Sequence, residues 1–384
     1  PTPAVAYLVR AQHADAGIMI SASHNSVEFN GIKLFSATGY KLPDAVEAEI
    51  EALILDTPEK IALKSHKEVG SMHAYETEDI GCTIDYAAGR NRYIGHLISL
   101  ATRSFKDMKI GLDCANGSAS ATAQALFEKL GATVHMLSDQ PNGLNINDHC
   151  GSTHMEQLMQ YVKTHDCDAG LAFDGDADRC LAVDENGNLV DGDQLIAICA
   201  KSYREKGKLK HNTAVGTVMT NLGFFHFAKK NHISVVTTNV GDRYVLESML
   251  QNGYNIGGEQ SGHIIFLDDA TTGDGELSGA KTMEILVQSG KKMSELAAVM
   301  DTFPQVMINV SMKPCHRGLW KQDQQVQDKI QAYTEQLGEN GRILVRESGT
   351  EPLIRVMVEG KDATAIQTAA EQIAAQIQEF VNRA

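Results

Sequence analysis

The sequence predicts a multidomain α/β protein in which three related α/β units, the first incomplete, precede a smaller C-terminal α+β lobe. A chain of 384 residues is too long for a single hydrophobic core. An apolar strand, a polar or glycine-containing turn, a helix and a further strand recur along the chain, whereas its last part reads as strands followed by one helix. We therefore expect four domains, at residues 1–78, 79–182, 183–300 and 301–384.

The three repeated units are expected to form largely parallel sheets, because strands that alternate with helices favour βαβ connections. In the second unit we expect Ser118 or Ser120 to cap the helix that follows the Asn116-Gly117 turn. The expected strands begin near residues 16, 109, 133, 214 and 233, and the expected helices cover residues 121–130 and 224–230.

The last part of the chain has a different pattern. Val306, Ile308 and Val310 alternate with polar residues, as in a half-buried strand. Two further strands, at residues 342–345 and 352–360, flank a polar loop. Asp362 is expected to cap a terminal helix, in which apolar residues recur at steps of three and four.

Composition excludes several classes of function. Lys and Arg number 34 and Asp and Glu 49, so the net charge is −15, which disfavours nucleic acid and anionic membranes as partners. No apolar run approaches the roughly 20 residues of a membrane helix, and no signal peptide is recognisable. Seven scattered cysteines without a C-x-x-C pair indicate reduced thiols, hence a cytoplasmic location.

The stretch GIMISASHN, residues 17–25, joins an expected strand directly to small polar residues. The carboxyl edge of a sheet is where open α/β proteins hold their reactive groups, and Ser23 and His24 are suited to that use. Ser and Asn are equally typical of turns and of helix N-caps. Both interpretations stay open for this stretch alone.

The stretch FDGDADR, residues 173–179, carries Asp174, Asp176 and Asp178 at alternate positions. Carboxylates this close repel one another unless a cation lies between them, and oxygen ligands favour a hard metal such as Mg²⁺. A calcium-binding EF-hand loop is one alternative, but it requires Gly where Arg179 stands. A solvated acidic turn is the other.

Two glycine-containing stretches complete the set. GGEQSGH, residues 257–263, places Glu259, Ser261 and His263 among glycines that allow a ligand close to the backbone, although a plain turn is an alternative. RESGTEPLIR combines arginines, hydroxyls and a glycine amide, which suit a phosphate dianion, although a surface hairpin would also fit. Its expected phosphate-binding residues are Arg346, Ser348, Gly349, Thr350 and Arg355.

Taken in this order, SASHN…NGIK, DGDADR, GEQSGH and RESGTEPLIR resemble the α-D-phosphohexomutase superfamily, and most closely its glucosamine-phosphate branch. The segments VDENGNLVDGDQ, VGDRYV and TTGDG are similar to that family as well. The resemblance covers nearly the whole chain. It implies four domains around a central cleft, a sugar phosphate as the ligand, and Mg²⁺ as the metal; it leaves a homodimer open.

The resemblance also implies an activity and residue roles. Ser23 would carry a phosphoryl group, give it to glucosamine 6-phosphate to form a 1,6-bisphosphate, and recover the other phosphate, leaving glucosamine 1-phosphate for UDP-N-acetylglucosamine and cell-wall synthesis. Glucosamine or glucose 1,6-bisphosphate would act as intermediate or activator. The implied metal ligands are the Ser23 phosphate, Asp174, Asp176 and Asp178. Arg179 would contact the transferring phosphoryl group, and Lys33, with a pKa lowered by cations, would move the proton, assisted by His24 or His263.

The sequence departs from the family pattern at three places. Ser26 and Asn239 replace a proline and a lysine that are common in relatives. The chain starts at Pro1 without a methionine, and an N-terminal Gly-rich loop with an active-site arginine is not found, so we expect an incomplete first domain. Phosphoglucomutase or phosphomannomutase activity, or sugar-phosphate binding without turnover, remain the alternatives.

Overall fold

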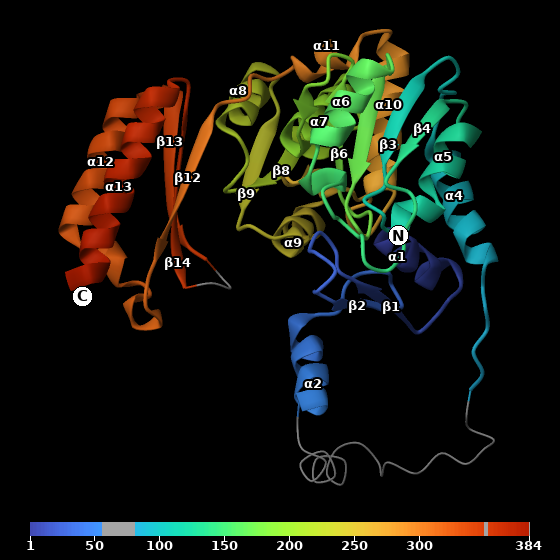
Figure 1. Ribbon diagram of the computed structural model, residues 1–384, viewed down its shortest axis with the longest axis horizontal. Coiled ribbons are helices and arrows are strands. Elements are labelled where there is room, and N and C mark those ends of the chain that lie inside the picture. Colours follow the sequence, from blue (N-terminus) through green and yellow to red (C-terminus); the bar gives the residue numbers. More distant parts are fainter. Residues whose placement is uncertain (56–80, 349–351, 384) are drawn as a thin grey trace.

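The computed structural model describes residues 1–55, 81–348 and 352–383, and these residues form four sheets on successive segments of the chain (Figure 1). The first unit has two antiparallel strands with a helix before and after them. Its Ile20 lies opposite Ile32, so the chain reverses between the strands without a helix. The expectation of a parallel βαβ connection here is wrong, because only nine residues separate the strands. Its elements are α1 (Thr2–Ala11), β1 (Ala16–Ser21), β2 (Gly31–Ser36) and α2 (Asp44–Leu55).

The second unit is a five-stranded sheet in the order β4-β3-β5-β6-β7. Strand β3 is parallel to β4 and β5, as expected, whereas β6 and β7 are antiparallel additions. The helix that follows β3 has Thr122 at its N-cap, so the prediction of Ser118 or Ser120 there is wrong; these serines lie in a 3-10 turn. The elements are α4 (Ala88–Leu100), β3 (Lys109–Asp113), α5 (Ala123–Lys129), β4 (Thr133–Leu137), α6 (Glu156–Thr164), β5 (Ala169–Phe173), β6 (Cys180–Asp184) and β7 (Leu189–Val190).

The third unit is a four-stranded sheet in the order β11-β10-β8-β9, in which β8 is parallel to both β9 and β10. The expected boundary between residues 182 and 183 falls inside β6. Because β6 and β7 both pair within the second sheet, the second and third sheets divide after Val190. Helix α7 starts there with a capping box made by Asp191 and Gln194. The elements are α7 (Gly192–Glu205), β8 (Thr213–Thr217), α8 (Leu222–Lys230), β9 (Ser234–Thr238), α9 (Asp242–Asn252), β10 (Ile256–Gly258), β11 (Ile264–Phe266), α10 (Gly275–Ser289) and α11 (Met293–Ala297).

The fourth unit is an antiparallel sheet, β12-β14-β13, with α12 and α13 packed on one face (Figure 1). Asp362 caps α13 as expected, since its Oδ1 accepts hydrogen bonds from the N–H groups of Thr364 and Ala365. The elements are β12 (Gln305–Ser311), α12 (Gln324–Leu337), β13 (Gly341–Glu347), β14 (Leu353–Gly360) and α13 (Ala363–Arg383).

The buried side chains explain how the units are joined. One large cluster runs through the second and third units and includes Ala4 of the first, whereas the fourth unit has its own cluster around Ile373. The fourth unit meets the third where β13 begins and β14 ends. There, buried Glu359 accepts a hydrogen bond from the Leu222 N–H at 2.7 Å and pairs with Arg342. The second and third units therefore form one packed body, to which the fourth is attached at one end.

Among the described residues, no helix is both long enough and apolar enough to span a bilayer.

Candidate active site

The loop after β1 places Ser23 beside the acidic loop of the second unit. Ser23 has a left-handed backbone, with φ of 55°, and its N–H donates to the Ser21 hydroxyl. Its carbonyl oxygen accepts hydrogen bonds from the Gly175 N–H at 3.0 Å and from Asn147 Nδ2 at 2.9 Å. Asn147 also binds the carbonyl of Asn25, at 2.7 Å. Sequence reasoning missed Asn147, because no motif surrounds it.

Close packing explains why Gly175 interrupts the acidic residues. A Cβ atom at this position would lie 2.4 Å from the carbonyl oxygen of Ser23, so any side chain would push the two loops apart. The structure therefore brings together two motifs that are 150 residues apart in the sequence.

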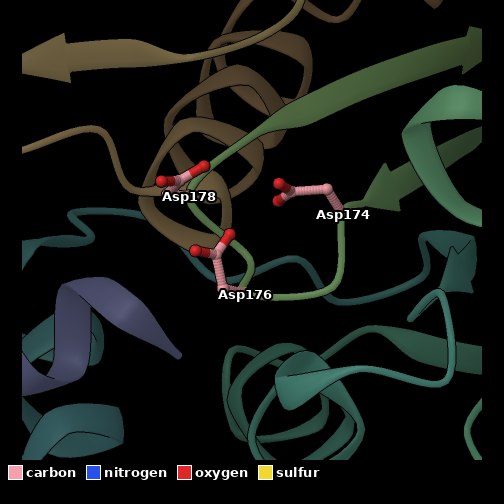
Figure 2. A group of neighbouring side chains, drawn as sticks. All are labelled: Asp174, Asp176 and Asp178. Atoms are coloured by element: carbon pink, nitrogen blue, oxygen red, sulfur yellow. The ribbon is translucent and has the colours of Figure 1, made fainter. Parts of the chain in front are cut away.

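The three aspartates converge from the loop between β5 and β6 (Figure 2). All three are buried, and one carboxylate oxygen from each lies within 4.8 Å of the others. Burial, followed by the charges of Asp178 and Asp176, raises the pKa of Asp174 well above its ordinary value. The arrangement is electrostatically costly unless a cation occupies it.

The unpaired oxygens of this cluster fit a hard divalent cation. Asp174 Oδ2 and Asp176 Oδ1 are buried without a hydrogen-bond partner among the described residues. Buried polar atoms are normally paired, and an all-oxygen donor set is what Mg²⁺ requires. The solvated-turn alternative is wrong because the carboxylates are buried, and the EF-hand alternative is wrong because residues 180–184 pair with β5 instead of encircling an ion.

Lys33 of the first unit contacts the acidic cluster directly. Lys33 reaches from β2 to the carboxylates of Asp176 and Asp178, with 3.0 Å between its Nζ and Asp178 Oδ2. Burial opposes protonation of Lys33, but the two carboxylates outweigh it and raise its pKa. The expectation of a lowered pKa is wrong, because anions and not cations surround this lysine.

His24 is the ionisable side chain that contacts the Ser23 hydroxyl, with 3.4 Å between its Nδ1 and Ser23 Oγ. Its pKa is lowered by desolvation and then by Arg179. Arg179 itself donates its backbone N–H to Asp174 Oδ1, and its side-chain Nε is buried without a hydrogen-bond partner among the described residues. Both side chains therefore lie close to where a phosphoryl group on Ser23 would be.

The loop between β10 and β11 carries the residues expected to bind the sugar. Gly262 has φ of 90°, and a Cβ atom there would lie 2.3 Å from the carbonyl of Cys180, the first residue of β6. Glu259 and Ser261 are half-buried, and Glu259 Oε1 accepts a hydrogen bond from the Gly241 N–H at 3.0 Å. The loop is thus packed directly against the strand that follows the acidic cluster.

His263 is buried behind this loop, where it contacts the acidic cluster. Its Nδ1 lies 3.5 Å from Asp178 Oδ1, and its Nε2 accepts a hydrogen bond from the Gly273 N–H. Burial alone would raise the pKa of Asp178, but His263 and Lys33 outweigh it and lower this pKa well below its ordinary value. Sequence reasoning grouped His263 with the sugar-binding residues; among the described residues its ring contacts Asp178, Asp242 and the Gly273 N–H.

The expected phosphate-binding residues lie on the hairpin of β13 and β14. Arg346 and Arg355 are directly opposite each other and half-buried, and burial followed by the charge of Arg355 lowers the pKa of Arg346. Ser348 is buried, and its carbonyl accepts a hydrogen bond from Arg317. Gly349 and Thr350 lie outside the described residues. The arginines are near the end of the sheet opposite the junction with α8.

The fold and the site together define an enzyme of phosphoryl transfer, with a serine loop, an acidic metal site and an arginine pair on separate units of one chain. The four domain models of the phosphoglucomutase/phosphomannomutase family match it in order. Domains I, II and III match residues 1–60, 91–187 and 191–303, and the C-terminal domain matches residues 307–376. The chain belongs to this family of phosphohexomutases.

Curated relatives are similar along the whole chain. A phosphoglucosamine mutase of Thermoanaerobacter pseudethanolicus is 51% identical over all of this chain and 83% of its own length. A phosphoglucosamine mutase of Acetivibrio thermocellus is 48% identical over 99% of this chain and 82% of its own length.

Solved structures share the fold at low identity. N-acetylphosphoglucosamine mutase of Aspergillus fumigatus, in complex with GlcNAc-6P and magnesium, superposes with a TM-score of 0.75 at 19% identity. The match covers 99% of this chain and 92% of that one.

Proposed function

We propose that the chain is a phosphoglucosamine mutase, which interconverts glucosamine 6-phosphate and glucosamine 1-phosphate through a phosphoserine at Ser23. Relatives of that activity match the chain from end to end. One observation carries the proposal: the Ser23 loop is hydrogen-bonded to a buried acidic loop whose carboxylates retain unpaired oxygens. A serine that alternately holds and releases a phosphoryl group needs such a site beside it.

The metal in this proposal is Mg²⁺, held by Asp174, Asp176, Asp178 and an oxygen of the Ser23 phosphate. When bound, it would offset the phosphate charge of about −1.5 to −2. The remaining work belongs to the protein's own residues. Arg179 neutralises the equatorial oxygens of the group in transit, and Lys33 holds Asp176 and Asp178 in place.

The reaction consists of two phosphoryl transfers that are related by symmetry. First, the P–O bond to Ser23 Oγ breaks as the free hydroxyl of the sugar attacks, which yields the 1,6-bisphosphate and a free serine. The bisphosphate then turns over, and Ser23 Oγ attacks its other phosphate. His24 is assigned the proton transfer in both steps, from the attacking hydroxyl and to the leaving oxygen, because its ring contacts Ser23 Oγ.

The substrate has to be held equally well in its two orientations. Glu259 and Ser261 are assigned to the sugar hydroxyls, whose positions are similar before and after the turn. The arginine hairpin is assigned to whichever phosphate is not reacting, because paired guanidinium groups bind a dianion in either orientation. Its residues in this proposal are Arg346, Ser348, Gly349, Thr350 and Arg355.

Replacing the nucleophile tests the proposal. Ser23→Ala should abolish turnover and the mass increase of one phosphoryl group on incubation with glucose 1,6-bisphosphate, while Ser26→Ala, three residues away, should keep both. Wild-type protein that binds the sugar phosphate but never acquires a phosphoryl group on Ser23 would indicate a binding protein without catalysis.

The sugar is tested by relative kcat/KM. The kcat/KM for glucosamine 6-phosphate should exceed the values for glucose 6-phosphate and mannose 6-phosphate. A preference for either of the latter two would assign the chain to phosphoglucomutase or phosphomannomutase activity, which the family description also covers.

A further inference from the structure

The corner that begins α9, Gly241-Asp242, contacts Glu259 and His263 of the sugar loop, although the proposed function assigns it no role. The N–H of Gly241 donates to Glu259 Oε1 at 3.0 Å. Asp242 Oδ2 lies 3.6 Å from His263 Nε2 and also pairs with Lys41 of the first unit. The first turn of α9 therefore contacts both Glu259 and His263.

A continuous series of contacts links the first unit to the acidic cluster. Lys41 pairs with Asp242, Asp242 faces His263, and His263 faces Asp178 at 3.5 Å. The two outer side chains are partly exposed, 30% for Lys41 and 29% for Asp242, whereas the two inner ones are buried, with 4% exposed for His263 and 5% for Asp178. Charges interact more strongly as water is excluded, so the contact at the surface is coupled to the buried one.

Lys41 is held in a defined position by the first unit. It forms a bridge with Phe35 after a tight turn at residues 36–40. That turn is docked on the third unit, since the hydroxyl of buried Thr271 donates to the Gly39 carbonyl at 2.6 Å. Gly39 has φ of 79°, and a Cβ atom there would lie 2.7 Å from the carbonyl of Ala6. The lysine therefore presents its charge from a rigid base.

A second ion pair at the same corner provides a natural comparison. Arg243, the next residue of α9, pairs with Asp44 at the start of α2, so the charges are reversed relative to Lys41 and Asp242. The Asp44 side chain is 74% exposed. An exposed pair of this kind contributes little energy, and neither of its residues is paired with His263.

We propose that Lys41 and Asp242 are positioning residues for the metal site. Their ion pair keeps His263 against Asp178, so that the unit carrying the Ser23 loop also sets the geometry of a metal ligand in another unit. Without Lys41, the Asp242 carboxylate would lose its cation partner and would no longer be held in place beside the His263 ring. The inference rests on the magnesium site of the proposed function.

The test uses Asp242→Asn and Lys41→Met, with Lys41→Arg as the conservative variant and Asp44→Asn as the matched control. Mg²⁺ affinity is measured by calorimetry, and the ring resonances of His263 are recorded by NMR on histidine-labelled, metal-free protein. Loss of a residue that supports a metal ligand typically costs 10- to 100-fold in affinity. We expect about 10-fold weaker Mg²⁺ binding for Asp242→Asn and about 3-fold for Lys41→Met, since the lysine acts one contact further away.

The His263 resonances should shift in both variants, return in Lys41→Arg, and stay unchanged in Asp44→Asn. Unchanged resonances in Asp242→Asn and Lys41→Met overturn the inference, and so does unchanged Mg²⁺ affinity. An equal effect in Asp44→Asn would also overturn it, by showing general loosening of the interface. If the wild-type protein binds no Mg²⁺, the proposed function fails, and the His263 resonances alone then decide whether the pair positions this histidine.

Discussion

The acidic loop and the arginine hairpin are built alike and differ in their surroundings. Each joins two neighbouring antiparallel strands, β5 to β6 and β13 to β14, and each brings like charges together, three aspartates in one and Arg346 and Arg355 in the other. The acidic side chains are short, buried and part of the body shared by the second and third units. The arginines are long, half-buried and carried by a unit with a core of its own.

The difference shows how burial decides what a cluster of like charges needs. Buried carboxylates cannot be neutralised by water, so they depend on a cation or on protonation at all times. Half-buried arginines remain partly hydrated, so they are tolerated without a bound anion and bind one when the substrate arrives. The acidic loop is therefore expected to be a permanent metal site, and the hairpin a site that is filled and emptied in every cycle.

Of the changes that test this comparison, Asp174→Asn should have the largest effect on activity. Losing a charged ligand removes several kcal/mol of stabilisation of the phosphoryl group in transit, so kcat/KM should fall at least about 100-fold. The metal-free protein should unfold no earlier than wild type, because one of three repelling carboxylates is gone and an amide can donate to its neighbours. Calorimetry with Mg²⁺ and thermal unfolding in EDTA measure the two effects. Wild-type Mg²⁺ affinity in this variant would contradict the permanent metal site.

A smaller effect is expected from Arg346→Gln. A charge-assisted hydrogen bond contributes about 1.5–3 kcal/mol, so KM should rise about 10- to 100-fold while kcat changes less. Mg²⁺ affinity should be unchanged, which separates the hairpin from the acidic loop. Arg383→Gln, on the outer surface of the same unit, is the matched control and should leave KM as it is. A fall in kcat with constant KM would show that the hairpin takes part in the chemical step.

The last effect is on stability and not on activity, and it concerns Asp193, near the junction of the third and fourth units. Its Oδ2 accepts a hydrogen bond from the Asn221 N–H, and burial followed by the charge of Asp191 raises its pKa from 3.8 to about 8. Because the folded protein holds this proton more tightly, the stability that Asp193 contributes is complete below about pH 4 and is lost as pH rises through about 8. In that window the free energy of unfolding should fall by up to about 1.4 kcal/mol per pH unit.

Urea unfolding between pH 5 and 8 measures this slope. Asp193→Asn should flatten the profile, whereas Asp148→Asn, at an exposed site, should not. An unchanged slope in Asp193→Asn would mean that this carboxyl group is not the one that titrates.

Sequence reasoning located several local elements that depend on short-range pattern. The strands that begin near residues 109, 133 and 214, the helix after Asp362 and the alternation in residues 305–311 are all present. Strand pairing was less predictable. The first unit forms a hairpin, and β6 joins the second sheet, because hydrogen bonding between strands is decided by contacts outside the window that any pattern covers.

The candidate site divides in the same way. Residue chemistry and spacing marked the aspartates, Ser23 and the arginines as candidates, since a carboxylate, a hydroxyl and a guanidinium each favour particular ligands, but the choice between a site and a turn rested on the resemblance to a family. The pKa of Lys33 was predicted in the wrong direction because its partners, Asp176 and Asp178, lie more than 140 residues away. Asn147 and the Lys41–Asp242 pair carry no motif and emerged only from their contacts.

By itself the sequence determined part of the secondary structure, the chemical character of each motif and the resemblance to a family, because these depend on residue type and local order. Only the tertiary structure decided that the Ser23 loop is hydrogen-bonded to Gly175, that three carboxylates are buried together with two unpaired oxygens among them, and that His263 contacts Asp178. Burial and long-range packing set charge states and orientations, and neither is encoded in any short stretch of the chain.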